Sequence, residues 1–446
     1  MAKQFIFAIS LLVTLGVFIF TTVRFIRFFL LTKPAFPLGN WLKRVGVMLR
    51  VAFIQTKIFR RPVTGFFHAL VFWGFCVILA GSIEMVIDGL SGSEKALRGF
   101  GFGYQVISLS ADIFALLVAI SIIVFLVRRL FLHISRFEGI EMKAVSHIDA
   151  ALALTMILLL MISLLGMNTT YIIKSSLSNQ HVAGIYPVSR NLCGLISGLP
   201  LNSVSRLYEF FWWSHILLIF LFANMLPYSK HFHVFMSVPN VFLSRLEPLG
   251  KLTTMESITR EVRIMLDPAG ADAAKQVEAP VQRFGVRDAE DVSWKNYLDS
   301  LACTECGRCT SVCPANITGK RLSPRKIMMD LRARMKEKGP MMIRKGREFN
   351  DGRSLIRDYI SEEELWACTT CNACSMECPI NINHPGLILD MRRYLVMEEG
   401  SAPGQLKAMF SYIENNGAPW QFSAEDRMLW AIDIEVRTIR EKVVLN

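Results

Sequence analysis

Charged residues are scarce in this sequence. They make up 19% of the 446 residues, compared with about 25% in ordinary soluble domains. Acidic residues are scarcer than basic ones, 37 against 49, so the net charge is +12. Glycine and proline are too few for a collagen-like chain, and the hydrophobic share of 52% is too high for a disordered one. The composition argues against an ordinary soluble enzyme and favours a membrane protein.

The apolar residues are gathered in long runs without charge. The first run, residues 5–23, has 19 residues, enough for a helix to cross the hydrocarbon core of a bilayer. Its length and the lack of a small-residue cleavage site favour a retained membrane helix over a cleaved signal peptide. Four further runs cover residues 63–83, 113–127 (extensible to 104), 150–168 and 210–228. We therefore expect five membrane-spanning helices.

Basic residues are unevenly distributed between these runs. Nine lie between the first and second runs and four follow the third, whereas the loop after the second run has two and the loop after the fourth has three. Lysine and arginine are retained on the cytoplasmic side of a membrane. The pattern predicts a protein of the bacterial or archaeal cytoplasmic membrane, with its N-terminus outside and the residues beyond 229 in the cytoplasm. Topology accounts for the positive charge, so we expect no nucleic-acid binding.

Eight of the ten cysteines form two copies of the pattern Cys-x2-Cys-x2-Cys-x3-Cys-Pro. This pattern is typical of proteins with two [4Fe-4S] clusters, in which the last cysteine of one motif binds the cluster of the other motif. Disulfides are disfavoured in the cytoplasm, and zinc sites are usually built from two pairs of ligands. We expect one cluster on Cys303, Cys306, Cys309 and Cys378, and the other on Cys368, Cys371, Cys374 and Cys313.

The 54 residues between the two cysteine motifs follow helical patterns. In residues 323–335, Ser323 is expected to cap a helix and Pro324 to stand at its first position. A compact ferredoxin would have a shorter insertion with strands. We expect an all-α fold with three parts: a five-helix transmembrane bundle (residues 1–235), an amphipathic and polar connector (236–292) and a cytoplasmic, α-helical ferredoxin-like domain with two clusters (293–446).

Histidines lie in or beside the apolar runs. His68 begins the second run and His233 follows the fifth run at the same depth, so two imidazoles from different helices can bind a b-type haem from both sides. His215 precedes His233 by 18 residues, five turns of a continuous helix, and is a candidate ligand for a second haem. In that geometry His231 points the opposite way. His147 is interpreted as an interfacial residue.

Two acidic residues, Glu84 and Asp112, lie toward the outer side of the membrane. An ionisable residue at such a place is a candidate for proton transfer to a quinone, but we interpret both as solvated residues at helix ends.

The five spans, His215, His233 and the stretch of residues 229–239 (Ser-Lys-His-Phe-His through Ser-Val-Pro) resemble the gamma subunit of respiratory nitrate reductases. The resemblance implies b-type haem and reaction with a quinone. In that family the second helix supplies two histidines ten residues apart. Here His68 matches the first, whereas the second position is Ile78.

The second cysteine motif and its surroundings, Leu365 to Cys374 and Pro379 to Ile382, resemble the iron–sulfur domain of heterodisulfide reductases. Together the two halves resemble the membrane-bound heterodisulfide reductase-like group, some of whose members pass electrons from electron-transfer flavoprotein to menaquinone. Single-chain members continue into Cys-Cys-Gly repeats. This sequence has no adjacent cysteine pair, so we expect that module in a separate subunit.

These features predict an oxidoreductase subunit that carries electrons between a cytoplasmic donor or partner and the quinone pool, through two [4Fe-4S] clusters and haem. Two alternatives stay open: a membrane-anchored iron–sulfur scaffold without haem, and an iron–sulfur redox sensor. The apolar C-terminal tail, with Trp420 and Trp430, is expected either to dock a partner or to cover the clusters as an intramolecular helix.

Overall fold

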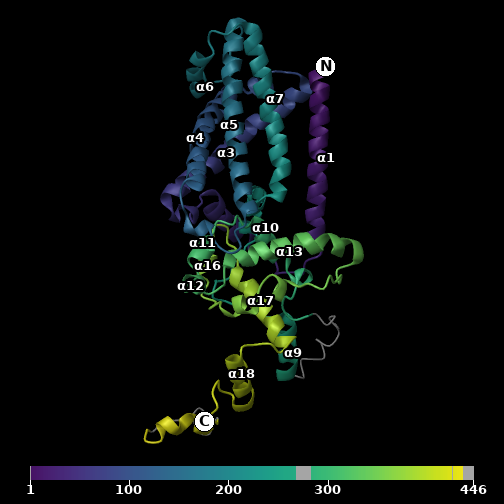
Figure 1. Ribbon diagram of the computed structural model, residues 1–446, viewed down its shortest axis with the longest axis vertical. Helices are drawn as coiled ribbons and strands as arrows, with labels where there is room; N and C mark the ends of the chain where they lie inside the picture. The colour runs from purple at the N-terminus through teal and green to yellow at the C-terminus, as the bar shows by residue number, and fades with distance from the viewer. Residues whose placement is uncertain (1, 268–282, 424, 435–446) are drawn as a thin grey trace.

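The computed structural model describes residues 2–267, 283–423 and 425–434. In these ranges the regular structure is helical, and no strand occurs apart from two isolated bridges. Figure 1 shows a tall bundle of helices at the top, a group of shorter helices below it and a tail that extends downward. The all-α fold expected from the sequence is confirmed.

The five expected spans are confirmed as long apolar helices. They are α1 (Ala2–Leu30), α3 (Pro62–Ser91), α4 (Phe102–Leu130), α5 (Ala144–Leu177) and the stretch Leu201–Tyr228, which begins with α7 (Leu201–Met225). α5 packs against both α4 and α7 and buries 44% of its most apolar stretch, compared with 11% for α1. The bundle is therefore built around α5, and α1 at its edge leaves most of its apolar surface for lipid.

The chain after the fifth span does not continue as one helix. α7 ends, two short 3-10 turns follow, and α8 (His233–Phe242) begins. Pro227 has no N–H with which to continue the helix, and the hydroxyl of Ser229 caps the second turn. The expectation that His215 and His233 lie on one face of a continuous helix is therefore wrong.

Short helices alternate with the cysteine motifs below the bundle. In this domain α13 (Pro324–Lys345) starts as predicted, because the hydroxyl of Ser323 accepts the N–H of Lys326 at 3.4 Å and Pro324 opens the helix. The others are α10 (Trp294–Ala302), α11 (Arg308–Ser311), α12 (Pro314–Ile317), α14 (Leu355–Asp358), α15 (Glu362–Trp366), α16 (Ala373–Glu377) and α17 (His384–Met397). Outside it lie α2 (Trp41–Met48), α6 (Pro187–Leu192), α9 (Glu256–Leu266) and α18 (Gly404–Asn416).

The bundle and the cysteine-containing domain share a hydrophobic core. Phe28 of α1 lies in the same cluster of buried side chains as Ile327 of α13. Glu141, in the loop between α4 and α5, forms a buried ion pair with Arg325 at 2.7 Å. The loops rich in basic residues therefore lie on the side of the cysteine-containing domain, as their charge pattern predicts.

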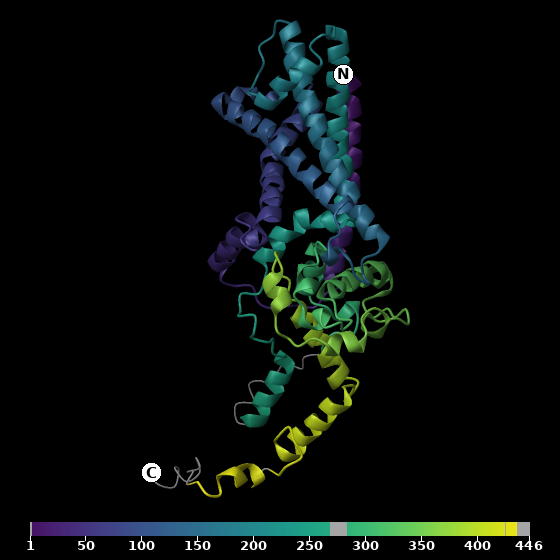
Figure 2. The same ribbon diagram turned by 60° about the vertical axis from the view of Figure 1, so that its left-hand side comes forward.

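The C-terminal tail extends away from both parts of the molecule (Figure 2). α18 has no buried residue, and the side chains of Trp420 and Trp430 are 55% and 68% exposed. In the part of the tail that the structure describes, no helix covers the cysteine motifs. The intramolecular cover considered from the sequence is not what residues 404–423 and 425–434 form.

Candidate iron–sulfur and haem sites

The eight motif cysteines gather in two groups. Cys309 lies close enough to Cys303, Cys306 and Cys378 for their thiolate charges to repel one another, and it also interacts, most weakly of the four, with Cys374 of the second group. Cys374 has corresponding neighbours in the second group, namely Cys313, Cys368 and Cys371. The last cysteine of each motif therefore has the first three cysteines of the other motif as neighbours. This arrangement is compatible with the expected ligand sets, which stay a prediction.

The backbone of the two motifs repeats the same unusual conformation. Glu305 and Thr370, each two residues after the first cysteine of its motif, have φ values of 57° and 55°. Gly307 and Asn372, two residues further on, have φ values of 71° and 61°. Glycine and asparagine tolerate this left-handed conformation better than other residues. Each motif thereby curls around its sulfurs, and this repeated turn chemistry was readable in the sequence.

Burial makes these thiols difficult to ionise. It raises the pKa of Cys303 to about 11 and the pKa values of Cys374 and Cys378 to about 12. Iron ions supply the positive charge that stabilises buried thiolates. In the described residues no three His, Cys, Asp or Glu side chains converge on a single metal ion. Thiolates spread around the corners of a cubane are the donor set that these groups fit.

Cations donate hydrogen bonds to the backbone of the cysteine loops. The ammonium of Lys57 reaches the carbonyl oxygens of Ser375 and Cys378 at 3.3 and 3.2 Å. Arg332 donates to the carbonyl oxygen of Cys303 at 3.0 Å, and Arg392 reaches that of Cys368 at 2.5 Å. This positive charge opposes the negative charge that clusters bring.

His68 and His233, from α3 and the start of α8, lie near each other. Their charges would interact directly. Nδ1 of His68 pairs with Oε1 of Gln55 at 3.1 Å, and Nδ1 of His233 pairs with the carbonyl oxygen of Lys230 at 3.2 Å. Nε2 of neither ring has a hydrogen-bond partner among the described residues. Burial lowers the pKa of His233, and a neutral imidazole with a free Nε2 is the form that binds haem iron.

Two neighbouring histidines have other contacts. The ring of His231 lies 5.9 Å from that of His233, centroid to centroid, and its Nδ1 pairs with the hydroxyl of Ser229 at 3.0 Å. The expectation that His231 points away from His233 fails because the helix is broken between the fifth span and α8. His147 is exposed near the start of α5, as expected of an interfacial residue.

His215 is buried near the middle of the fifth span. Its Nδ1 lies 2.9 Å from the hydroxyl of Ser163 and 3.0 Å from the carbonyl oxygen of Leu160. The neighbouring cavity has a volume of about 40 Å³ and is lined by His215 and Ile78 together. This volume holds about three water molecules. Ile78 therefore lines the same cavity as His215.

Glu84 and Asp112 are not solvated helix-end residues. Asp112 is fully buried, and its Oδ2 accepts the N–H groups of Val188 and Ser189 at 2.8 and 3.1 Å, at the start of α6. Glu84 accepts the hydroxyl of Tyr104 at 3.3 Å. The interpretation from the sequence was wrong because the loops beyond these helices fold back over them.

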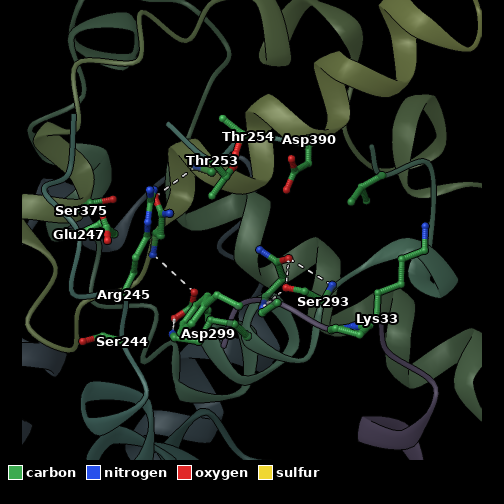
Figure 3. A pocket seen from close by; sticks show the side chains of 18 of the residues that line it. Lys33, Ser244, Arg245, Glu247, Thr253, Thr254, Ser293, Asp299, Ser375 and Asp390 are labelled. Carbon is green, nitrogen blue, oxygen red and sulfur yellow. Dashed lines mark hydrogen bonds and ion pairs between the residues drawn. The ribbon is translucent and has the colours of Figure 1, made fainter. Parts of the chain in front are cut away.

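A cavity of about 1460 Å³ opens beside the loop that carries Cys378 (Figure 3). Lys33, from the end of the first span, and Asp299, from α10, line it together with Ser375. Figure 3 shows Arg245 and Asp390 on its walls as well. Charged groups of both signs therefore surround an opening next to one cysteine group.

Comparisons with known proteins agree with this architecture. Residues 302–382 match the family described as "4Fe-4S dicluster domain". The "EtfAB:quinone oxidoreductase" of Syntrophomonas wolfei is 28% identical over 471 residues, which cover 99% of this chain and 61% of the relative. A subunit of the ferredoxin/F(420)H(2)-dependent CoB-CoM heterodisulfide reductase of Methanosarcina acetivorans is 36% identical over 102 residues, 23% of this chain and 49% of the relative. The chain is a relative of heterodisulfide reductase-like membrane oxidoreductases.

A further relative is the "Probable iron-sulfur-binding oxidoreductase FadF" of Bacillus subtilis, 29% identical over 425 residues, which cover 87% of this chain and 55% of the relative. This chain therefore spans only 55 to 61% of the length of the two relatives that it matches along most of its own length. No solved structure matches it significantly. It is a membrane-anchored iron–sulfur electron-transfer protein, with its cysteine-containing part in a dicluster domain.

The grouping of the cysteines predicts that the last cysteine of each motif binds the cluster held by the other motif. Cys313→Ser should alter the electron paramagnetic resonance (EPR) spectrum of the cluster on Cys368, Cys371 and Cys374, because each group depends on the last cysteine of the other motif. Cys378→Ser should alter the other cluster. Cys193→Ser, outside both groups, is the control and should leave both signals unchanged. Loss of the same signal in both motif variants would contradict the crossed arrangement.

Proposed function

We propose that this protein is a membrane electron-transfer subunit that connects a redox partner on its dicluster side with the quinone pool. Two [4Fe-4S] clusters and one b-type haem would supply the one-electron chemistry. The chain holds their ligands, sets their distances and excludes water between them. We further propose that the dicluster side faces the cytoplasm, because the basic loops lie there.

One observation carries this proposal: Lys230 contacts both candidate sites. Its ammonium lies 3.4 Å from a carboxylate oxygen of Glu305, which stands between Cys303 and Cys306, and its carbonyl oxygen pairs with Nδ1 of His233. A scaffold that only tethered a dicluster domain would not need a histidine site coupled so closely to the first cysteine loop.

A second connection leads to the other histidine. The guanidinium of Arg308, next to Cys309, donates to the carbonyl oxygens of Lys57 and Ile58 at 2.9 and 3.2 Å. This segment starts at Gln55, whose side chain pairs with His68. Both haem-ligand candidates are thus tied to the same cysteine loop by short backbone segments, which favours rapid electron transfer between the two sites.

The proposal contains one haem, held by His68 and His233. The cavity beside His215 is lined by Ile78 and, among the described residues, by no second histidine, and Nδ1 of His215 is already engaged by Ser163 and Leu160. A six-coordinate haem needs a ligand on each side of the iron.

The printed names of the relatives supply the candidate reaction. One is named as an EtfAB:quinone oxidoreductase, and others are named as subunits of heterodisulfide reductases. We propose menaquinone or another quinone as the diffusible substrate. Electron-transfer flavoprotein and a subunit with Cys-Cys-Gly repeats are the proposed partners, and the mixed-charge cavity beside Cys378 faces the side from which they would approach.

An optical spectrum tests the proposal. The purified protein, reduced with dithionite and compared with its oxidised form, should show a b-type haem signal at about one haem per chain, together with iron and labile sulfide for two clusters. Addition of a menaquinone analogue should reoxidise the haem. Intact clusters without haem would instead leave the five helices as the anchor of an iron–sulfur scaffold and would contradict the proposed electron path.

A further inference from the structure

Five arginines gather where the dicluster domain meets the membrane bundle. Arg136 lies close enough to interact electrostatically with Arg61, Arg128 and Arg308. Burial, followed by the repulsion of Arg61, lowers the pKa of Arg136 to about 10. Arg129 lies at the end of α4 beside Arg128, and the carboxylates of Glu305 and Asp149 compensate part of its charge. Like charges at partly buried positions repel one another unless an anion compensates them.

Two of these arginines have buried donors without acceptors. In the described part of the chain, Nε and Nη2 of Arg129 and Nε and Nη1 of Arg136 are out of contact with solvent and make no hydrogen bond. Arg128, by contrast, donates to the hydroxyl of Thr64 at 2.9 Å. A buried donor without a partner costs about 1–3 kcal/mol, and more when it is charged. Four such atoms, on two arginines that contact the same phenylalanine ring, point to an acceptor that is not a protein group.

Both guanidinium groups pack against the same aromatic ring. The Cζ atoms of Arg129 and Arg136 lie 5.2 and 5.0 Å from the centroid of the Phe137 ring. Nε and Nη2 of an arginine share one edge of the guanidinium, and this edge binds a carboxylate or phosphate with two parallel hydrogen bonds. The unpartnered donors of Arg129 are that pair, so the arrangement is built for oxyanions.

The arginine pair lies beside the candidate haem site. The charge of Arg129 interacts with His231, whose ring contacts that of His233. The charge of Arg308, a neighbour of Arg136, interacts with His68. An anion at this place would therefore lie between the two histidines and the first cysteine loop.

We propose that Arg129 and Arg136 bind the propionate carboxylates of the haem held by His68 and His233. This inference rests on the proposed function. A haem carries two carboxylates on one edge, and the two arginines beside Phe137, with their unpartnered donors, match them in number and charge. The pair thereby orients the acidic edge of the haem toward the dicluster domain and stabilises the reduced, more negative state of the haem.

Another oxyanion has the same chemistry. The phosphate of an anionic lipid at the inner leaflet would also accept these hydrogen bonds. The propionates are favoured because the unpartnered nitrogen atoms are enclosed and lie close to both histidines. The charge of Cys306 also interacts with Arg136. A negatively charged iron–sulfur cluster bound by Cys306 is therefore a third possible source of negative charge for these arginines.

The test uses the full-length holoprotein with the double change Arg129→Gln and Arg136→Gln. Optical redox titration should give a more negative midpoint potential for the haem, and transfer of haem to apomyoglobin should become about 10- to 100-fold faster. Arg128→Gln is the matched control, because it removes one charge at the same helix end without removing an unpartnered donor. Replacement of both arginines with lysine should restore most of the midpoint potential, because lysine keeps the positive charge. It should not restore the slow transfer of haem to apomyoglobin, because lysine lacks the two parallel N–H donors of a guanidinium group.

Each other outcome has a distinct meaning. Absence of haem from the wild-type protein would overturn the proposed function together with this inference. If the wild-type protein holds haem but the double variant behaves like Arg128→Gln, the propionate assignment is overturned and the proposed function stands. The assignment is also overturned if the variant loses a co-purifying anionic lipid, measured by mass spectrometry, or shifts only the EPR-monitored potential of a cluster, while the haem is unchanged.

Discussion

We expect that His68→Ala and His233→Ala each abolish the b-type haem signal of the purified protein while both iron–sulfur clusters stay intact. The reason is the number of ligands. Each histidine offers one free Nε2, and each is oriented through Nδ1 by an acceptor on the protein, Gln55 or Lys230. Removal of either imidazole leaves the iron with one protein ligand. Reduced-minus-oxidised absorption and EPR of the same preparation measure the two kinds of cofactor separately.

His231→Ala is the matched control for this experiment. Its ring lies next to that of His233, but its Nδ1 pairs with Ser229, and Asp149 lies 4.0 Å away. The variant should therefore keep its haem. His215→Ala should keep it as well, since Nδ1 of His215 pairs with Ser163 and Leu160 within the bundle, away from His68 and His233. Haem retained in both His68→Ala and His233→Ala, or lost only in His231→Ala, would refute the ligand assignment.

The membrane spans could be predicted from the sequence because each is a local run of uncharged residues. Their lengths could not. α5 continues to Leu177, beyond the expected end at residue 168, through the polar residues Thr169 and Thr170. Their hydroxyl groups bond back to the carbonyl oxygens of Leu165 and Gly166, four residues earlier, at 2.7 and 2.8 Å. A polar residue satisfied by its own helix does not end that helix, although it interrupts the apolar run.

The cysteine motifs were equally local, whereas the histidine geometry was not. The phase between His215 and His233 depended on an unbroken helix, and the chain around Pro227 breaks it. Gln55, which orients His68, is 1% exposed and has a φ value of 58°. No periodic pattern marks such a residue. Contacts between segments far apart in the chain, including the arginine pair, appear only once the two halves are folded together.

Asp288→Asn should destabilise the dicluster domain by about 3–5 kcal/mol, because it leaves buried cations without full compensation. Asp288 is 1% exposed. Its oxygens accept Nε and Nη2 of Arg334 at 2.8 and 2.7 Å, Nζ of Lys338 at 2.7 Å and the N–H of Leu355 at 3.1 Å. Guanidinium-induced loss of cluster absorbance, followed in one detergent, measures the change. Glu337→Gln removes an exposed ion pair with Arg353 and should cost about 1 kcal/mol or less.

Asp288 and Asp330, a residue of α13, should contribute to stability with different pH dependences. Burial pushes the pKa of Asp288 upward, but hydrogen bonds from Arg334 and Lys338 outweigh it and hold the pKa below its ordinary value. Its contribution should therefore be constant from pH 8 to pH 5 and be lost only below about pH 4. Burial raises the pKa of Asp330 to about 6 despite its pairing with Lys326.

A raised carboxyl pKa has the opposite sign, since the folded protein then binds a proton that the unfolded chain has already released. Asp330 stabilises the fold fully below about pH 4, and this contribution is lost as pH rises through its folded pKa of about 6. Asp330→Asn should therefore gain stability relative to the wild type between pH 5 and pH 7, while Asp288→Asn keeps a constant deficit. If the stability difference from the wild type followed the same pH curve in both variants, the pKa of Asp330 would not be raised while that of Asp288 is lowered.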